Sequence, residues 1–250
     1  MGVARSVLRI DAPDSLRSPW LEALVAILLA VSTLTVLGRP GVSSYVLVTH
    51  YLGTLKMAAV LYMAMLAGSL ASALENGYAS TLMQAPSPRA LVAMGLLASR
   101  VLLPAGILTA ASAVGFVLLL WGVADDLAWP AAINYSFTFL ELVGYGSAFM
   151  LTALITRSSS KTIIASLMLY LVVGMGGEAL VFLGLALSSR AMVMAGLLGN
   201  PAEAAGIYAG YVDLGGLVGG EALTPLIAGS TWMMSMMVLA PIYFERWMEA

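Results

Sequence analysis

Three charged residues inside long apolar stretches are the side chains of this sequence best suited to chemistry. Lys56, Glu141 and Glu178 each lie roughly 14 to 15 Å from one end of an apolar segment, at 1.5 Å per helical residue. A charge within a bilayer costs about 2.5 to 3.5 kcal/mol or more, so it is usually paired or functional. The three residues are therefore candidates for a polar belt along a transport pathway.

Two structural alternatives stand beside that interpretation. Lys56 could pair with Glu141 or Glu178 and tie helices together, in which case we expect the unpaired carboxyl to carry a proton. If its segment begins near Leu52, Lys56 could instead extend outward to the membrane surface. Glycines flank both glutamates and would allow close helix approach or a kink: Gly144, Gly146, Gly174, Gly176 and Gly177.

Other catalytic chemistry has no basis in the sequence. The chain has one His, His50, and no Cys, so a transition-metal site built from these ligands is not expected. Neither Lys56 nor Lys161 follows a Gly, so no phosphate-binding loop exists and the chain alone cannot hydrolyse ATP. His50 lacks a Ser and acid around it. The four Met of residues 232–237 indicate packing and lipid contact rather than soft-metal binding. We therefore expect no catalytic residue, cofactor or metal on this chain.

The composition determines the class of protein. Of 250 residues, 61% are hydrophobic and only 10% are charged, whereas a soluble domain is about 25% charged. So few charges cannot cover a water-soluble surface of this size. The net charge of -2 without a basic patch excludes nucleic-acid binding. The chain is predicted to be a single all-α membrane domain over residues 1–250.

Apolar runs long enough to cross a bilayer predict six transmembrane helices. They are Trp20–Leu37, Val46–Ala73, Val101–Val123, Ala131–Ile155, Ile163–Leu187 and Leu223–Phe244. Residues 1–19 precede the first helix and are expected to form either a short amphipathic helix, through Val3, Val7, Leu8 and Ile10, or a flexible tail. The charges within this stretch exclude a cleavable signal peptide.

The distribution of Lys and Arg predicts the orientation, because cytoplasmic loops are enriched in these residues. With both termini in the cytoplasm, the outer segments carry only Arg39 and Arg190. The inner segments carry Arg5, Arg9, Arg17, Arg89, Arg100, Arg157, Lys161 and Arg246. This asymmetry predicts a multi-pass protein of the cytoplasmic membrane.

The long outer segment, residues 188–222, predicts two short helices. We expect them at Ala191–Leu198 and Pro201–Tyr211, with a break at Gly199 and with Asn200 capping the second helix. Such a pair could enter the membrane partway from outside if it is buried against protein, or it could lie on the outer surface.

The long inner segment, residues 74–100, carries the most specific pattern. After Glu75 it turns at Asn76-Gly77, continues as an amphipathic stretch to Met83, breaks at residues 86–88 and restarts as a helix that enters the third span. Such an amphipathic helix suits a groove on a partner protein.

This inner segment resembles that of the permeases of type-2 ABC transporters, in which a Glu ends the second span and a Gly, a Thr-Leu pair and a Pro-x-Ser-Arg end follow. The matching residues are Glu75, Gly77, Thr81, Leu82, Pro86, Ser87, Pro88 and Arg89. Two departures are that Gly77 is not adjacent to Thr81 and that Pro88 stands before Arg89, where Ser is common. The outer stretch Asn200-Pro201-Ala202-Glu203 is similar to the family's N-P-x-[DE], which precedes the last span.

The resemblance implies a permease subunit of an ATP-driven exporter, with ATP and Mg on a separate cytoplasmic ATPase subunit. A second permease subunit would complete the pathway, and Glu75 to Arg89, Tyr78 included, would form the coupling helix. Residues 156–161 would make a lesser contact or serve only as a basic turn. The mostly apolar interior favours lipophilic or amphipathic cargo.

A second hypothesis is a proton- or cation-coupled secondary transporter or channel that uses Lys56, Glu141 and Glu178. No inverted repeat supports it. An intramembrane enzyme is disfavoured because a nucleophile and base pair is missing from the sequence.

Overall fold

The computed structural model describes residues 7, 11, 19–37, 44–77, 89–120, 125–208 and 219–247, and apart from short turns these residues are helical. The helices in chain order are α2 (Pro19–Leu37), α3 (Ser44–Glu75), α5 (Arg89–Leu97), η1 (Ala98–Leu102), α6 (Leu103–Leu120), α7 (Asp125–Thr156), α8 (Ser159–Tyr170), η2 (Leu171–Met175), α9 (Gly176–Ala186), α10 (Arg190–Leu197), α11 (Pro201–Tyr208) and α12 (Gly219–Trp247).

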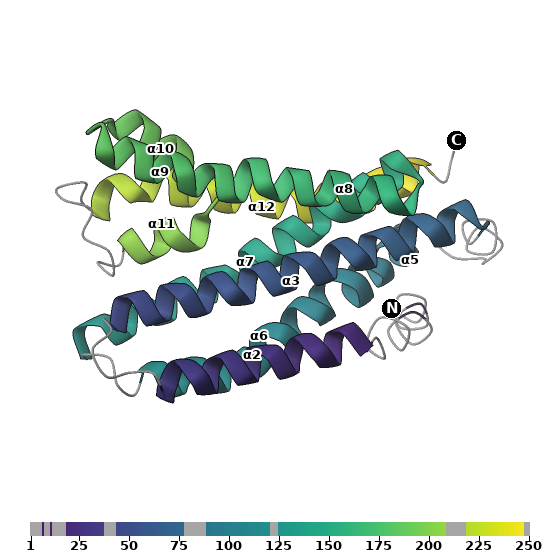
Figure 1. Cartoon of the computed structure of the whole chain (residues 1–250). Coiled ribbons are helices and arrows are strands. Elements are labelled where there is room, and N and C mark those ends of the chain that lie inside the picture. The colour runs from purple at the N-terminus through teal and green to yellow at the C-terminus, as the bar shows by residue number, and fades with distance from the viewer. Residues whose placement is uncertain are drawn as a thin grey trace.

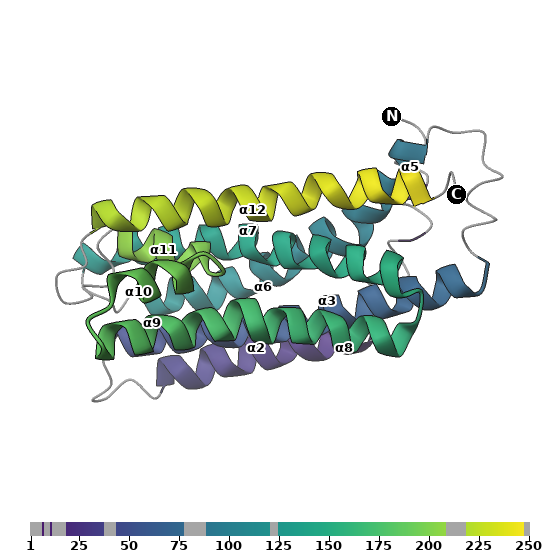
Figure 2. The same cartoon turned by 90° about the horizontal axis from the view of Figure 1, so that it is seen from above.

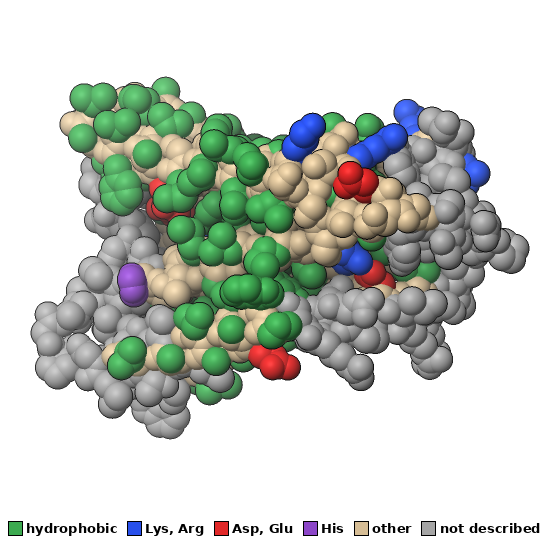
Figure 3. Space-filling model, turned by 45° about the vertical axis from the view of Figure 1, so that its right-hand side comes forward, with side chains coloured by type: hydrophobic (Ala, Val, Ile, Leu, Met, Phe, Trp, Pro, Cys, Tyr) green, Lys and Arg blue, Asp and Glu red, His purple; other side chains and the backbone are tan. Residues whose placement is uncertain are grey.

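Five helical stretches are long and apolar enough to cross a membrane. They are His50–Glu75, Arg89–Val117, Ala131–Thr156, Ser159–Ala186 and Gly220–Arg246. Large hydrophobic side chains such as Val172 and Phe182 are exposed on them. On the face shown in Figure 3, hydrophobic side chains cover much of the surface, and the Lys and Arg side chains lie toward one end. The expected α-helical multi-pass membrane protein is thus confirmed.

The long helices run back and forth along one axis (Figures 1 and 2). The start of α2, the end of α3, the start of α5 and the end of α12 share one end of the bundle, and α10 and α11 lie at the opposite end. Helix α7 is the central element, in contact with α3, α6, α8, α11 and α12. Close approach to α7 requires glycine, since a side chain on Gly144 would meet Met233 and one on Gly146 would meet Val101.

The turn expected at Asn76-Gly77 is confirmed. Gly77 has a positive φ of 84°, and its backbone N–H donates to the Leu74 carbonyl at 3.3 Å. The Asn76 N–H donates to the Ser72 carbonyl at 3.0 Å. Because only glycine adopts this conformation without strain, Gly77 has a structural role in ending α3.

Two π-helical turns interrupt the second and fourth of the five apolar stretches, and the sequence analysis predicted neither. Pro104 lies just beyond η1 and has no N–H to donate to the Arg100 carbonyl four residues earlier, which favours a wider turn there. Gly174 and Gly176 occur within and after η2, where the missing side chains allow the helix to deform.

The helix that follows the Pro86 break begins at Arg89 and continues through η1 into α6, as expected. Predictions for Tyr78, Thr81, Leu82, Pro86 and Ser87 fall outside the described residues, as does most of the N-terminal amphipathic pattern.

The first testable prediction concerns sidedness, and it uses the chain's lack of Cys. The sequence analysis predicts positions 87 and 159 inside and positions 126 and 203 outside. The structure provides two exposed probes, Ser160 near the α7–α8 turn and Arg190 at the start of α10. A membrane-impermeant thiol reagent should label Arg190→Cys in intact cells and Ser160→Cys only after the membrane is opened. The reverse pattern would contradict the predicted orientation.

Candidate functional site

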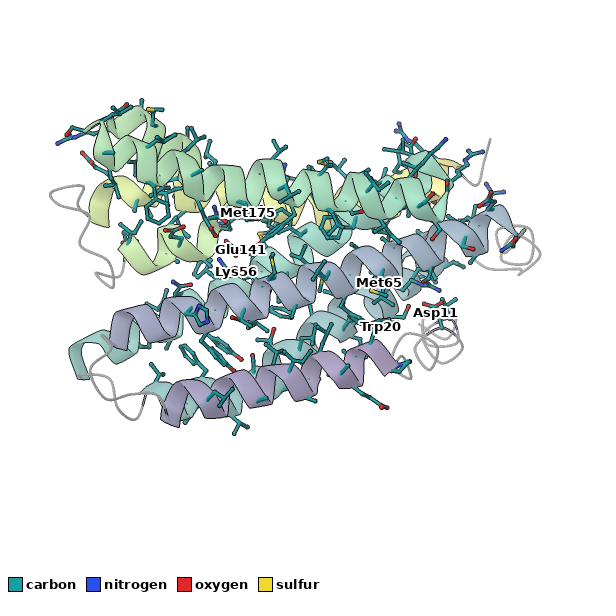
Figure 4. The ribbon with its side chains drawn as sticks, in the orientation of Figure 1. Asp11, Trp20, Lys56, Met65, Glu141 and Met175 are labelled. Atoms are coloured by element: carbon teal, nitrogen blue, oxygen red, sulfur yellow. The ribbon has the colours of Figure 1, made fainter. Side chains whose placement is uncertain are left out.

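A buried ion pair joins α3 to α7 at the centre of the bundle. The Lys56 Nζ lies 2.7 Å from Glu141 Oε2, and the two side chains are 12% and 2% exposed. Figure 4 shows the two residues between α3, α7 and α11. The expected pairing of Lys56 with one of two glutamates is confirmed, with Glu141 as the partner. Lys56 therefore does not extend outward to the membrane surface.

Glu141 also binds the start of α11. Its second oxygen, Oε1, accepts a hydrogen bond from the Ala202 backbone N–H at 3.1 Å. The first N–H groups of a helix have no partner within it and carry a partial positive charge, so a carboxylate stabilises them. Capping was predicted for Asn200, but here a carboxylate from α7 supplies the acceptor. One Glu thus connects α3, α7 and α11.

The turn before α11 is fixed by two further hydrogen bonds. Asn200 Nδ2 donates to the Gly174 carbonyl in η2 at 3.0 Å, and the Tyr145 hydroxyl donates to the Gly199 carbonyl at 2.9 Å. A π-turn breaks the regular pattern of backbone bonds, and Asn200 supplies a donor to one of its carbonyls. The turn between α10 and α11 is therefore bound to η2 and α7, and entry of this pair into the membrane stays a prediction.

Two more carboxyl groups lie within electrostatic range of this ion pair. Glu178, in the first turn of α9, and Glu203, in the first turn of α11, both interact electrostatically with Lys56 and Glu141. Glu178 is half-buried and forms no ion pair with Lys56 in the structure. Sequence reasoning matched Glu203 to the motif N-P-x-[DE] but did not place it near Lys56. Its spacing three residues after Asn200 is the signal that could have placed it near a helix start.

The glycines beside Glu178 permit close contact between α9 and α10. A methyl group on Gly177 would lie 2.6 Å from the Gly196 carbonyl oxygen and 2.9 Å from Asn200 Nδ2. One on neighbouring Gly176 would meet nothing closer than the Leu171 carbonyl at 3.4 Å. Both glycines are in the first turn of α9, so they form a matched pair for mutation.

The second prediction follows from this pair. Gly177→Ala should lower the free energy of unfolding by about 1 to 3 kcal/mol, because backbone atoms of α10 must move to admit the methyl group. Gly176→Ala should be near neutral. Thermal unfolding in lipid nanodiscs measures both, and equal melting temperatures for the two variants would contradict the close contact.

The described residues of the inner segment lie far from the ion pair. Glu75 is the exposed last residue of α3, and Arg89 is the first residue of α5. They lie at the end of the bundle opposite α10 and α11 (Figure 1). The candidate residues therefore form two groups, one around Lys56 and one at the α3–α5 connection.

The arrangement can bind helices together and hold or exchange protons at carboxyl groups. In the part of the chain that the structure describes, no three His, Cys, Asp or Glu side chains are grouped to hold a metal ion. Fold and site together define a multi-pass α-helical membrane protein with a polar centre. No protein-family model and no curated protein matches the sequence.

Proposed function

We propose that this chain is the permease subunit of an ATP-driven exporter of the type-2 ABC class. In this proposal α2, a 19-residue helix packed against α3 and α6, is the first of six transmembrane helices, and the five apolar stretches described above are the others. Both termini and the α3–α5 connection face the cytoplasm. The pair α10–α11 enters the membrane from outside.

The single observation that carries the proposal is the position of the stretch Asn200 to Glu203. This stretch resembles the family's motif before the last span, and its residues contact the Lys56–Glu141 pair and η2. A motif that merely connected two spans would have no reason to contact the polar centre of the bundle. The family resemblance and the contacts to Glu141 and η2 thus fall on the same short stretch, through Ala202 and Asn200.

The proposed mechanism follows from the separation of the two groups of candidate residues. An ATPase bound beneath the α3–α5 connection would move the inner ends of α3 and α5 as it closes on ATP. Because α3 carries Lys56, this motion would reach the ion pair and, through Glu141, the start of α11. Exposure of the pathway would then alternate between the two sides of the membrane.

The experiment that tests the proposal is purification of the tagged chain from its native membrane in mild detergent. A soluble ATPase should co-purify, and vanadate should inhibit its activity in the complex. A chain that purifies without any ATPase under conditions that preserve its fold would contradict the proposal.

A second candidate is a proton- or cation-coupled transporter, and the observation in its favour is the pair of additional carboxyl groups, Glu178 and Glu203, near Lys56. Liposomes that contain the chain alone distinguish the candidates. Dissipation of an imposed proton gradient that Glu178→Gln abolishes would favour the second candidate, whereas the exporter subunit should leave the gradient intact.

A further inference from the structure

A second buried ionic network lies at the proposed inner end of the bundle, away from Lys56. Asp11 is 3% exposed, and its carboxylate accepts hydrogen bonds from Arg100 Nη2 at 2.6 Å and Arg100 Nε at 2.9 Å. Ser99 Oγ donates to the same carboxylate at 2.5 Å. Figure 4 shows Asp11 near the start of α2, beyond Trp20. A residue from the N-terminal segment is thus bound to η1, 88 residues later in the chain.

The same arginine also holds α3. Arg100 Nη1 donates to the Leu66 carbonyl at 3.2 Å and to Ser69 Oγ at 2.7 Å. Ser69 in turn donates to the Leu66 carbonyl at 2.8 Å. The guanidinium therefore connects the last third of α3 to the π-turn that follows α5. Helices α3 and α5 are the two helices on either side of the inner segment.

Arg100 lies in a π-turn, so it connects α3 to a part of the helix that can deform. A π-turn is a deformable point in a helix, and η1 separates α5 from α6 within the apolar stretch Arg89–Val117. The planar guanidinium bonds two partners at once in a geometry that Lys cannot reproduce. Without the Asp11 carboxylate, Arg100 would be a largely buried cation held only by its bonds to Leu66 and Ser69.

We propose that Asp11 and Arg100 are positioning residues that set the spacing of α3 and α5 and so transmit motion from the ATPase to the spans. Asp11 is then part of the apparatus that couples the ATPase to the spans. The transmission role rests on the proposed function, whereas the spacing role does not. We call the Asp11, Ser99 and Arg100 contacts the N-terminal clamp.

The test measures the distance between nitroxide labels at Asn76 and Met94, which are exposed residues just after α3 and within α5. The full-length chain is purified with its ATPase and placed in lipid nanodiscs. Pulsed electron spin resonance gives the distance distribution at rest and after addition of ATP, Mg and vanadate. The unmodified background should show one narrow distribution that shifts on nucleotide trapping.

Asp11→Asn preserves the shape of the side chain and removes its charge. It should at least double the width of the resting distribution and abolish the vanadate-induced shift, while ATP hydrolysis by the bound subunit continues. Arg100→Lys should do the same, because Lys cannot bond Asp11 and α3 at once in the geometry of the guanidinium. Glu221→Gln is the matched control, because it breaks the exposed Arg190–Glu221 ion pair at the opposite end of the bundle.

An unchanged resting distribution in Asp11→Asn would overturn the inference that the N-terminal clamp sets the spacing of α3 and α5. A wider resting distribution with a normal vanadate-induced shift would overturn the transmission role and leave a structural ion pair. If no ATPase co-purifies, the proposed function and the transmission role both fail, but the resting distance still decides whether the clamp sets the spacing of α3 and α5.

Discussion

Replacing Lys56 with Met is expected to destabilise the protein by about 3 to 5 kcal/mol, because it leaves Glu141 buried without its cation. Glu141 is 1% exposed and cannot regain solvent without moving α7. Its remaining hydrogen bond from the Ala202 N–H offsets only part of that cost. Thermal unfolding of the variant in lipid nanodiscs should show a much lower midpoint than that of the natural sequence.

Two further variants distinguish the loss of stability caused by breaking the ion pair from the loss that any mutation in this region would cause. Glu178→Gln should change the stability by less than about 1 kcal/mol, because Glu178 forms no ion pair with Lys56. The double variant Lys56→Met with Glu141→Gln should regain stability relative to Lys56→Met alone, since no unpaired charge remains and Gln can still accept from Ala202. If the Lys56→Met midpoint and export rate both equal those of the natural sequence, the ion pair neither stabilises the bundle nor serves transport.

Replacing Glu75 and Arg89 together with Gln should weaken the association with the ATPase by roughly tenfold, or about 1.4 kcal/mol. Both residues flank the segment that we propose as the coupling helix, and Glu75 is exposed where a partner could reach it. Loss of these charges should also separate ATP hydrolysis from export. Binding of the purified ATPase to immobilised permease measures the first effect, and hydrolysis per exported molecule measures the second.

The matched control for this double variant is Arg190→Gln with Glu221→Gln. That pair is oppositely charged too, with an Nη1 to Oε1 distance of 3.0 Å, but it lies at the other end of the bundle. Its loss should leave ATPase binding unchanged. Equal binding by the Glu75 and Arg89 variant and by the control, with both proteins folded, would contradict the coupling assignment.

Local sequence patterns alone predicted the helices with good accuracy. A transmembrane helix satisfies its own backbone hydrogen bonds, so an apolar run of sufficient length is enough to predict it. The helix predicted at Ala191–Leu198 is α10 at Arg190–Leu197, and the one predicted from Pro201 is α11. The restart after Pro86 was also predictable, because Pro and Gly act on the backbone within one turn of themselves.

For contacts between distant segments, the sequence limited the number of candidate partners but did not identify the actual one. Equal depth limited the partner of Lys56 to Glu141 or Glu178, and only the packing of α3 against α7 selects Glu141. Arg100 was counted as an ordinary cytoplasmic charge and Asp11 as part of a terminal segment, yet they form a buried ion pair.

The N-terminal clamp shows the physical reason why helices were predictable from the sequence and contacts between distant segments were not. Helix formation depends on residues within about four positions of each other, and the sequence displays them directly. The contact between Asp11 and Arg100 spans 89 positions, and it depends on how α3 and η1 lie against each other in three dimensions. The sequence by itself determined which segments form long apolar helices, whereas only the tertiary structure decided which buried charges meet, because charge pairing is set by helix packing and leaves no periodic signal along the chain.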